Sequence, residues 1–257
     1  MGKLADVDKI EIVRMYQEGQ TCKGISEEFG VTDESIRGLL DRRGVSRRTR
    51  KYVANEQFFD EIDSEEKAYW LGFLFADGNI SNTTVSVSLN QKDLSHLQKF
   101  QKAVASGNEL KYRSEKNAWY ARVHSRHMVE SLRELGCVER KSKIIKVPLI
   151  KSDCLSHFYR GHFDGDGWIT YRMQSGKWKT WQCGVASQSM VFLEKLHQWV
   201  TDNTGRKFGS LYTRGDGRCS VLDFAGKRSV ASFLGLLYEG STVFLDRKKK
   251  ICEEVLK

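Results

Sequence analysis

Two segments of the sequence repeat each other, and this duplication constrains the fold more than any other feature of the chain. The segment WLGFLFADG at residues 70–78 matches YRGHFDGDG at residues 159–167. Two further matches follow in the same order: LQKF at 97–100 with LEKL at 193–196, and ERKS at 139–142 with DRKK at 246–249. Three matches in one order indicate an internal duplication. The sequence therefore predicts two similar structural units that meet near residue 150.

Each copy has the same order of helical and strand patterns. A helix ends at Asp-Gly, and two strands, a second helix, two more strands and a third helix follow. In the first copy Val85, Val87 and Leu89 alternate with polar residues, as in a strand with one buried face. In the second copy the first hairpin is longer and turns between residues 173 and 180. These patterns predict an α+β fold made of two αββαββα repeats.

The helix in each matching segment has a face of small residues. Gly72 and Ala76 are four residues apart in the first helix, and Gly161 and Gly165 have the same spacing in the second. Residues at this spacing share one face of a helix, and small side chains allow two helix backbones to approach closely. The sequence therefore predicts that these two helices pack on each other.

Both helices, expected over residues 68–77 and 156–166, end with an aspartate that a glycine follows. A carboxylate at a helix C-terminus is unfavourable by roughly 0.3–1 kcal/mol, because the helix dipole places partial negative charge there. A divalent cation between Asp77 and Asp166 would relieve this conflict, since Mg²⁺ prefers carboxylate and carbonyl oxygens. For one copy alone, an ordinary helix stop with a left-handed glycine cap is the simpler interpretation. Its occurrence in both copies favours a metal site.

Residues 6–43 have the pattern of three short helices, with Thr32 expected to cap the third. A basic stretch without an acidic residue follows, consisting of Arg42, Arg43, Arg47, Arg48, Arg50 and Lys51. We place the first boundary after this stretch. The predicted domains are a helical domain at 1–51, a first repeat at 52–150 and a second repeat at 151–257. A three-helix packing module without DNA-binding function is the alternative for the first domain.

The composition favours a polyanionic partner. The chain has 42 Lys and Arg against 33 Asp and Glu, a net charge of +9, which is typical of proteins that bind nucleic acid. The six cysteines are scattered without a CxxC pair, so neither a zinc site nor a disulfide framework is predicted. No apolar signal-peptide core or membrane-span pattern is present. We therefore expect a cytoplasmic protein, from a bacterium or a phage-infected cell, without a membrane partner.

The matching segments resemble the two signature motifs of LAGLIDADG homing endonucleases, and the resemblance covers residues from about 60 to 257. It implies two αββαββα repeats around a pseudo-twofold axis, with both sheets forming a saddle over double-stranded DNA. It also implies an intron-homing, Mg²⁺-dependent endonuclease that makes a double-strand break in a long asymmetric target, hydrolysing phosphodiesters with metal-bound water. Mn²⁺ or Ca²⁺ is expected to occupy the same site, Ca²⁺ without supporting cleavage. A chain with both repeats is expected to act as a monomer.

The resemblance assigns catalytic and metal-binding roles to single residues. The last acid of each motif falls on Asp77 and Asp166, and the backbone carbonyls of Ala76 and Gly165 are expected as further metal ligands. The lysines expected to polarise water or stabilise the phosphate, and the polar residues expected in a water network, are Lys141, Lys248, Gln91 and Ser187. A solvated lysine in a charged run is the alternative at each lysine position.

Three positions depart from the family pattern. Phe75 replaces the first acid of the first motif, which is not the essential one. Arg160 and His162 place polar groups inside the second motif helix. If these two side chains pointed into the interface, they would prevent the close packing of the two helices.

Residues 20–40 resemble a helix-turn-helix of resolvase type, whose second helix enters the major groove. Polar strand faces of the two repeats are expected to contact base edges there. The predicted DNA contacts are Ser35, Arg37, Arg42, Arg43, Arg47, Arg48, Arg50, Ser86, Ser88, Asn90, Lys111, Arg113, Arg122, Lys177, Lys179, Gln182, Arg214 and Arg218. Two alternatives on the same scaffold stay open: a non-catalytic DNA-binding transcriptional regulator, and an RNA-splicing maturase whose partner is intron RNA.

Overall fold

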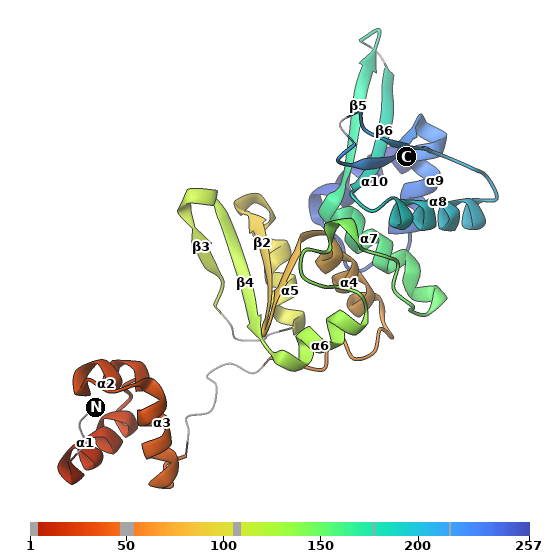
Figure 1. Ribbon diagram of the computed structural model, residues 1–257. Coiled ribbons are helices and arrows are strands. Elements are labelled where there is room, and N and C mark those ends of the chain that lie inside the picture. The colour runs from red at the N-terminus through yellow and green to blue at the C-terminus, as the bar shows by residue number, and fades with distance from the viewer. Residues whose placement is uncertain (1–4, 47–53, 105–108, 177, 216) are drawn as a thin grey trace. The chain divides into compact units, whose positions relative to one another are not determined.

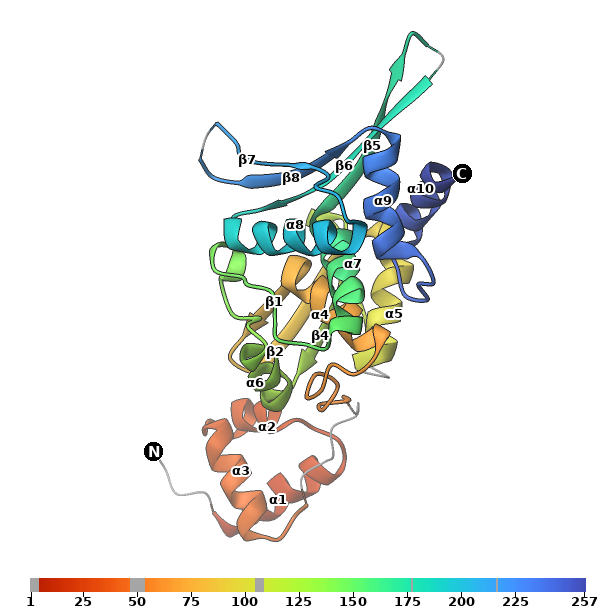
Figure 2. The same cartoon turned by 90° about the vertical axis from the view of Figure 1, so that its right-hand side faces the viewer.

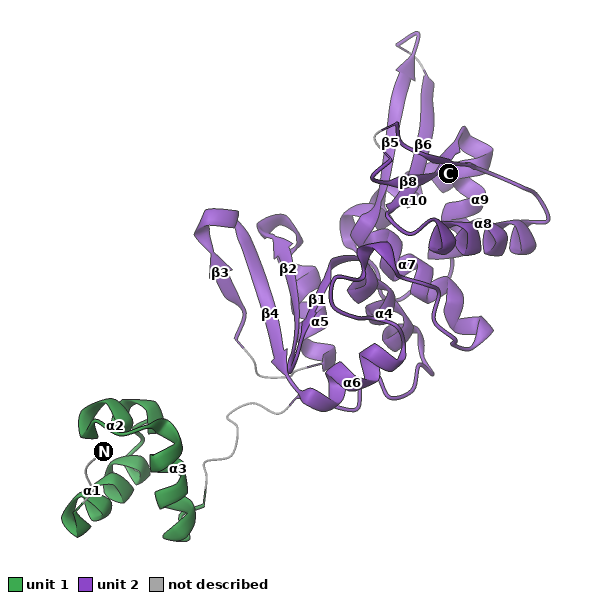
Figure 3. Ribbon diagram, viewed as in Figure 1, with its two compact units in different colours: residues 1–51 green, residues 52–257 purple. Residues whose placement is uncertain are grey.

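The computed structural model describes residues 5–46, 54–104, 109–176, 178–215 and 217–257. The chain divides into two compact units, residues 1–51 and residues 52–257 (Figure 3). Within the described residues, the first unit contains three helices, and the second contains both copies of the repeat. Each unit has a hydrophobic core of its own.

The helices of the first unit are α1 (Asp6–Gln17), α2 (Cys22–Phe29) and α3 (Asp33–Arg42). The hydroxyl of Thr21 accepts a hydrogen bond from the backbone of Gly24 at the start of α2, and that of Thr32 accepts from Ser35 at the start of α3. Gly30 ends α2 with a φ of 61°, a left-handed conformation that suits glycine. Side chains from all three helices meet in one core, among them Ile12, Ile25 and Ile36.

The first repeat has the order αββαββα. Its elements are α4 (Glu65–Asp77), β1 (Gly78–Ser81), β2 (Thr84–Asn90), η1 (Gln91–Asp93), α5 (Leu94–Val104), β3 (Lys111–Arg113), η2 (Ser114–Lys116), β4 (Ala118–His124), α6 (Arg126–Glu134) and η3 (Lys141–Lys143).

The second repeat has the same order and one further helix at its end. Its elements are η4 (Ser152–Cys154), α7 (Leu155–Asp166), β5 (Gly167–Gln174), β6 (Trp178–Ser187), α8 (Met190–Thr204), β7 (Ser210–Thr213), β8 (Ser220–Ala225), α9 (Lys227–Tyr238) and α10 (Asp246–Leu256). The predicted α+β class and the repeat of αββαββα are confirmed. The long hairpin that the sequence predicts near residues 173–180 is β5–β6.

Each repeat forms one antiparallel sheet, with strand orders β1-β2-β4-β3 and β5-β6-β8-β7. Helices α5 and α6 contact the first sheet, and α8 and α9 contact the second. The faces toward these helices carry core residues such as Val85 and Val123 in the first sheet, and Val185 and Phe224 in the second. Both repeats therefore have the same layered arrangement (Figures 1 and 2).

Helices α4 and α7 pack on each other between the two sheets (Figures 1 and 2). A methyl group at Gly72 would lie 1.9 Å from the carbonyl oxygen of Phe158, and a methyl group at Gly161 would lie 1.9 Å from that of Tyr69. A methyl group at Gly165 would lie 2.4 Å from the Cβ of Ala76. The small faces predicted from the sequence are therefore the contact surface of the two helices.

The glycines after the two helices differ from the left-handed caps considered above. Gly78 has φ −74° and ψ 138°, and Gly167 has φ −84° and ψ 164°, which is extended backbone. Each is the first residue of the strand that follows its helix. A methyl group there would lie 2.5 Å from the carbonyl oxygen of Leu74 or 2.6 Å from that of Phe163. Close backbone approach, and not a positive φ, requires glycine at both positions.

Candidate active site and nucleic-acid interface

Asp77 and Asp166 lie beside each other at the C-termini of the paired helices. A methyl group on Gly165, the residue before Asp166, would lie 3.3 Å from Oδ2 of Asp77. Both aspartates remain partly open to solvent, and the Asp166 side chain is 44% exposed. The close packing of α4 and α7 thus brings one carboxylate from each repeat to a single accessible position.

The surroundings of the two acids disfavour their negative charges. Desolvation raises the pKa of Asp77 above its ordinary value, although the positive charges of Lys248 and Lys141 oppose this shift. Desolvation, together with the negative charge of Asp77, raises the pKa of Asp166 to about 6. A cation bound between the two carboxylates would offset their unfavourable negative charges.

Lys141 and Lys248 cap the two motif helices from within the protein. Lys141 is 8% exposed and donates to the carbonyl oxygen of Gly78. Lys248 is 3% exposed and donates to the carbonyl oxygens of Phe163 at 2.5 Å, Asp164 at 2.9 Å and Gly167 at 2.5 Å. Cations at helix C-termini offset the negative end of the helix dipole. The solvated alternative considered for these lysines is wrong.

The hydrogen bonds of Lys248 also limit what it can do. An ammonium group has three N–H donors, and the three carbonyl oxygens of the α7 terminus occupy all of them. Burial lowers the pKa of Lys248 to about 8, so it is mostly charged at neutral pH. Its positive charge lowers the pKa values of Asp77 and Asp166. We therefore interpret Lys248 as a residue that caps α7 and favours the ionised form of the two acids, and not as a direct phosphate ligand.

The donors at the two helix ends fit a hard divalent cation. Asp77 and Asp166 are the last residues of α4 and α7, and Ala76 and Gly165 precede them there. Carboxylate and backbone carbonyl oxygens are the donors that a cation such as Mg²⁺ takes while it keeps several waters. In the described part of the chain no group of three or more His, Cys, Asp or Glu side chains forms a metal-binding cluster. A transition-metal cage built from side chains alone is therefore not present among these residues, whereas carboxylate oxygens are the donor type that a hard divalent cation takes.

The other acid of the second motif, Asp164, is buried and belongs to a hydrogen-bond network. Its carboxylate accepts from the hydroxyl of Tyr69 at 2.7 Å, the hydroxyl of Tyr238 at 2.5 Å and the backbone of Leu245 at 2.7 Å. Tyr69 belongs to α4, so the network joins the two repeats. Phe75, the matching residue of the first motif, is 2% exposed and packs against Phe158. Asp164 and the matching Phe75 therefore both stabilise the fold, Asp164 through hydrogen bonds and Phe75 through apolar packing.

Arg160 is buried but does not disrupt the pairing of the motif helices. Its guanidinium donates to Glu65 of α4 at 2.6 Å and to the carbonyl oxygens of Val243 and Leu237, each at 2.9 Å. Glu65 also accepts from the backbone of Thr242 at 2.7 Å. Arg160 thus ties the start of α4 to the segment between α9 and α10, beside the small-residue face.

Gln91 and Ser187 do not hydrogen-bond to either acid. Gln91 accepts from the indole N–H of Trp119, and the hydroxyl of Ser187 accepts from the backbone of Ser189 at 3.1 Å. Ser187 is 7% exposed at the turn that leads into α8. The predicted water-network role has no support in these contacts.

The first sheet has one polar, basic face away from its helices. Ser86 pairs with Arg122, and Asn90 pairs with Ala118, which also pairs with Arg113. Paired residues project from the same face of a sheet. All six residues predicted on this sheet share that face: Ser86, Ser88, Asn90, Lys111, Arg113 and Arg122.

Tyr120 lies on the same face and was not predicted. The guanidinium carbons of Arg113 and Arg122 lie 4.6 Å and 5.4 Å from the centre of its ring. These stacked cations are held at defined places on the face. The sequence signal was present, because Tyr120 alternates with Arg122 and His124 along one strand.

The second sheet corrects one prediction. Lys179 pairs with Met173 and lies on the same side as Trp181 and Cys183, where it donates to Glu254 of α10. Lys179 therefore faces the helices and not the opposite surface, where Gln182 lies. Arg172, which was not predicted, pairs with Thr180 and shares the outer face with Gln182.

Two of the other residues predicted around the second sheet lie in a loop, and Gln182 lies within strand β6. Arg214 and Arg218 are exposed in the loop that joins β7 and β8. Gln182 donates its amide to both carboxylate oxygens of Asp223 at 2.9 Å. Lys177 lies outside the described residues.

In the first unit, the predicted contact residues cluster on α3. Ser35 hydrogen-bonds to the hydroxyl of Thr32 at 2.9 Å, and Arg37 pairs with Asp33 within the helix. Arg42 and Arg43 are exposed at the end of α3. Arg47, Arg48, Arg50 and Lys51 lie outside the described residues.

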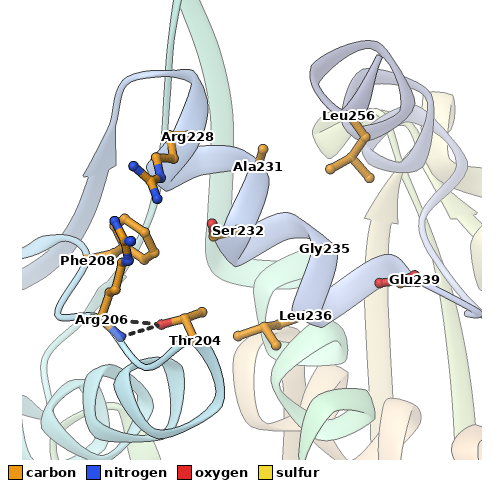
Figure 4. Close-up of a pocket in the computed structure, with 10 residues that line it drawn as sticks. All are labelled: Thr204, Arg206, Phe208, Arg228, Ala231, Ser232, Gly235, Leu236, Glu239 and Leu256. Atoms are coloured by element: carbon orange, nitrogen blue, oxygen red, sulfur yellow. Dashed lines mark hydrogen bonds between the residues drawn. The ribbon is translucent and has the colours of Figure 1, made fainter.

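A hollow of about 520 Å³ lies elsewhere, among α8, α9 and α10 (Figure 4). Arg206, Phe208 and Arg228 line one part of it, and Leu236 and Glu239 another. None of its lining residues belongs to the candidate site at Asp77 and Asp166. Among the described helices, none has the length and apolar character needed to cross a membrane.

The fold and the acids together define a class of protein: two αββαββα repeats in one chain, joined through paired helices that each present a terminal carboxylate. The I-LtrWI LAGLIDADG homing endonuclease bound to target DNA aligns with 79% of this chain and 90% of its own, at a TM-score of 0.50 and 9% identity. The meganuclease I-SmaMI bound to DNA aligns with 74% of this chain and 88% of its own, at 0.50 and 12%. The chain has the fold of the LAGLIDADG homing endonucleases.

Sequence comparisons add little to this structural likeness. No protein-family model matches the chain. A stretch of 134 residues, 47% of this chain, is 29% identical to part of the replication factor C small subunit of Methanocaldococcus jannaschii. That stretch is 7% of the length of that protein, so the chain spans a small part of it.

Proposed function

We propose that the chain is a site-specific DNA endonuclease that depends on a divalent metal and cuts both strands of a long, asymmetric target. The observation that carries this proposal is the placement of one carboxylate from each repeat at the end of two helices in backbone contact. The two strands of a duplex are themselves related by a twofold axis, so paired acids suit a cut in each strand. The two solved proteins of this fold named above were crystallised with DNA.

We assign Mg²⁺ to the position between the helix ends, with Asp77, Asp166 and the carbonyls of Ala76 and Gly165 as its protein ligands. When bound, it would stabilise the attacking and leaving oxygens of a phosphodiester displacement. The protein's own part is to hold both carboxylates close together in an environment that raises their pKa values. Lys141 and Lys248 cap the helix ends and keep a positive charge beside the acids.

The outer sheet faces supply the DNA-binding surface in this proposal. Arg113, Arg122 and Lys111 on the first sheet and Arg172 on the second would contact phosphates or guanine edges. Side chains between them, such as Ser88, are suited to base contacts. The two sheets differ in sequence at these positions, so the two halves of the target are expected to differ. With both halves of the site in one chain, we expect a monomer on DNA.

We propose that the first unit is a second DNA-binding module. Helices α2 and α3 are joined by a three-residue turn that starts at Gly30, an arrangement typical of helix-turn-helix domains. Arg42 and Arg43 at the end of α3, followed by further arginines in the sequence, would contact phosphates. Replacing Arg42 and Arg43 by alanine should weaken DNA binding and reduce its salt dependence, without changing the position of the cut.

The test of this proposal begins with selection of the target itself. Sequences bound in Ca²⁺ would be selected from a randomised DNA library, and the recovered site would be placed in a supercoiled plasmid. The full chain should linearise that plasmid in Mg²⁺, and a chelator or a scrambled site should prevent cleavage. Selective binding without any cut in Mg²⁺ or Mn²⁺ would indicate a transcriptional regulator. Tighter binding to intron RNA than to any duplex would indicate a maturase.

A further inference from the structure

His162 is a buried, unpartnered group beside one of the two acids. Its side chain is 1% exposed, and neither ring nitrogen has a hydrogen-bond partner among the described residues. The ring packs at 4.3 Å against that of Phe192, which fixes its plane. Buried imidazoles are normally hydrogen-bonded, so an unpartnered one in a functional region needs an explanation.

The ring of His162 is neutral and can donate one hydrogen bond. Burial lowers its pKa to about 3, and the charges of Lys141 and Lys248 act in the same direction. A neutral imidazole carries one N–H donor and one acceptor nitrogen. The positive lysines nearby offer nothing for the donor, because ammonium groups have no acceptor.

A carboxylate oxygen, that of Asp166, lies just beyond hydrogen-bonding reach of this ring. Nε2 of His162 lies 3.9 Å from Oδ2 of Asp166, one helical turn further along α7. This separation is too long for a hydrogen bond. The Asp166 side chain is 44% exposed and ends the helix, so its carboxylate has room to turn toward the ring.

In the first repeat, the position that matches His162 has no hydrogen-bonding side chain. The residue that matches His162 is Phe73, which is 1% exposed and packs among the rings of Tyr69, Trp70 and His96. A phenyl ring cannot donate a hydrogen bond to Asp77. The chain itself therefore shows that this position accepts an aromatic ring without a donor.

We propose that His162 is a positioning residue for Asp166, donating from Nε2–H to Oδ2 when the site is assembled on DNA and metal. That bond would hold one oxygen of Asp166 and leave the other directed at the metal position. This inference rests on the proposed function, because it concerns the orientation of a proposed metal ligand. Its consequence is an asymmetric enzyme in which only one of the two strand cuts depends on a histidine.

The principal test compares His162→Phe, which copies Phe73, with His162→Gln, which keeps a donor. Each strand of the target would carry its own end label, so that both cutting rates are measured in one reaction. In His162→Phe we expect one strand to be cut roughly 10- to 100-fold more slowly, as for other groups that orient metal ligands, so that nicked DNA accumulates. His162→Gln should recover most of that rate. Equal slowing of both strands without recovery by glutamine, or no slowing at all, would overturn the proposal.

A second measurement tests the hydrogen bond from His162 to Asp166 even if the chain cuts no DNA. Nitrogen-15 spectra of histidine-labelled protein bound to the selected target in Ca²⁺ at neutral pH, with the His162 signals assigned from His162→Gln, report which ring nitrogen carries the proton. We expect the Nε2–H form in the wild type and a mixture of both forms in Asp166→Ala. A wild-type ring protonated on Nδ1 would overturn the proposal. Absence of cleavage together with the expected spectra would reject the proposed function and leave the contact between His162 and Asp166 standing.

Discussion

The two repeats share one topology but differ in the chemistry around their acids. In the first repeat Asp77 ends a helix whose neighbouring positions hold Phe73 and Phe75. In the second, Asp166 follows His162 and Asp164, both buried. Small residues at the helix contact and glycine after each acid are retained in both copies, because a Cβ atom added at Gly72 or Gly161 would lie 1.9 Å from a carbonyl oxygen of the other helix. Positions away from that contact have diverged.

The difference between the repeats separates residues that stabilise the fold from residues that could serve one half of the site. Asp164 is stabilised by two tyrosine hydroxyls and a backbone N–H, so its burial needs no functional explanation. His162 has no hydrogen-bond partner within the described part of the chain. The hairpins differ as well, since β1 pairs with β2 over four residues and β5 with β6 over eight. An asymmetric protein of this kind suits an asymmetric target.

The largest effect that we expect on stability is at the interface glycines, which both repeats have. Gly72→Ala and Gly161→Ala each place a methyl group 1.9 Å from a carbonyl oxygen of the other helix. Each should lower the free energy of unfolding by about 3 kcal/mol or more, because neither backbone can move away without losing the contact. Urea unfolding measures the loss. Gly235→Ala is the matched control: it has no neighbour within 4 Å and should stabilise the protein by about 0.5–1 kcal/mol. A loss at only one of the two interface glycines would break the equivalence of the repeats.

A smaller and unequal effect is expected at the capping lysines. Lys248→Met leaves three carbonyl oxygens without their donor, whereas Lys141→Met leaves one. We expect losses in unfolding free energy of about 3 kcal/mol and about 1 kcal/mol respectively, since unsatisfied buried acceptors are costly. Urea unfolding at neutral pH compares the two variants directly. Equal losses would show that the second repeat does not depend more strongly on its lysine.

The two acids should couple stability to pH. The pKa of Asp166 is about 6 in the folded chain, above its value when unfolded. Folding therefore gains from this group at low pH, and the gain is lost as pH rises through about 6. Metal-free protein should melt at a lower temperature at neutral pH than at mildly acidic pH, and Asp166→Asn should remove most of that slope.

The companion variant is Asp77→Asn, which should also remove part of the slope, because desolvation raises the pKa of Asp77 as well. Added Mg²⁺ should act most strongly at neutral pH, where both carboxylates are ionised and available to it. Thermal melts at several pH values, with and without Mg²⁺, test both statements. A wild-type slope indistinguishable from that of Asp166→Asn would refute the assignment.

The smallest effect that we expect is on the salt dependence of DNA affinity, and it distinguishes the two faces of the β5–β6 hairpin. Arg172 lies on the outer face, whereas Lys179 lies on the face toward α10 and pairs with Glu254. Arg172→Ala should reduce the dependence of DNA affinity on salt by about one phosphate contact, and Lys179→Ala should leave it unchanged. Equilibrium titrations at several salt concentrations measure both slopes. A reduction for Lys179→Ala alone would mean that the hairpin meets DNA with the opposite face.

Much of the fold could be predicted because its signals are local and occur twice. The alternation from Thr84 to Asn90 and the small faces of the motif helices each specify a buried side. The side on which Lys179 lies could not be predicted. A strand slipped by one residue places every side chain on the opposite face, and the tip of this hairpin carries aromatic and basic residues on both faces.

The pairing of the two acids was predictable, but their surroundings were not. Asp77 and Asp166 are marked by the duplicated motif, and the structure places them beside each other. The capping of α7 by Lys248 depends on how α10 packs, which no local pattern encodes. The burial of His162 depends on Phe192 from another helix. Contacts of this kind arise from tertiary packing and appear only once the elements are assembled.

The most direct test of the paired-acid site is cleavage by the acid variants. On DNA with the selected target and an end label on each strand, the wild type should cut both strands in Mg²⁺. Asp77→Asn and Asp166→Asn should each reduce double-strand cleavage by roughly 10³-fold. Their double variant should cut neither strand, although it binds the target in Ca²⁺ as tightly as the wild type. Full cleavage by the double variant would contradict the assignment of these two carboxylates as the catalytic site.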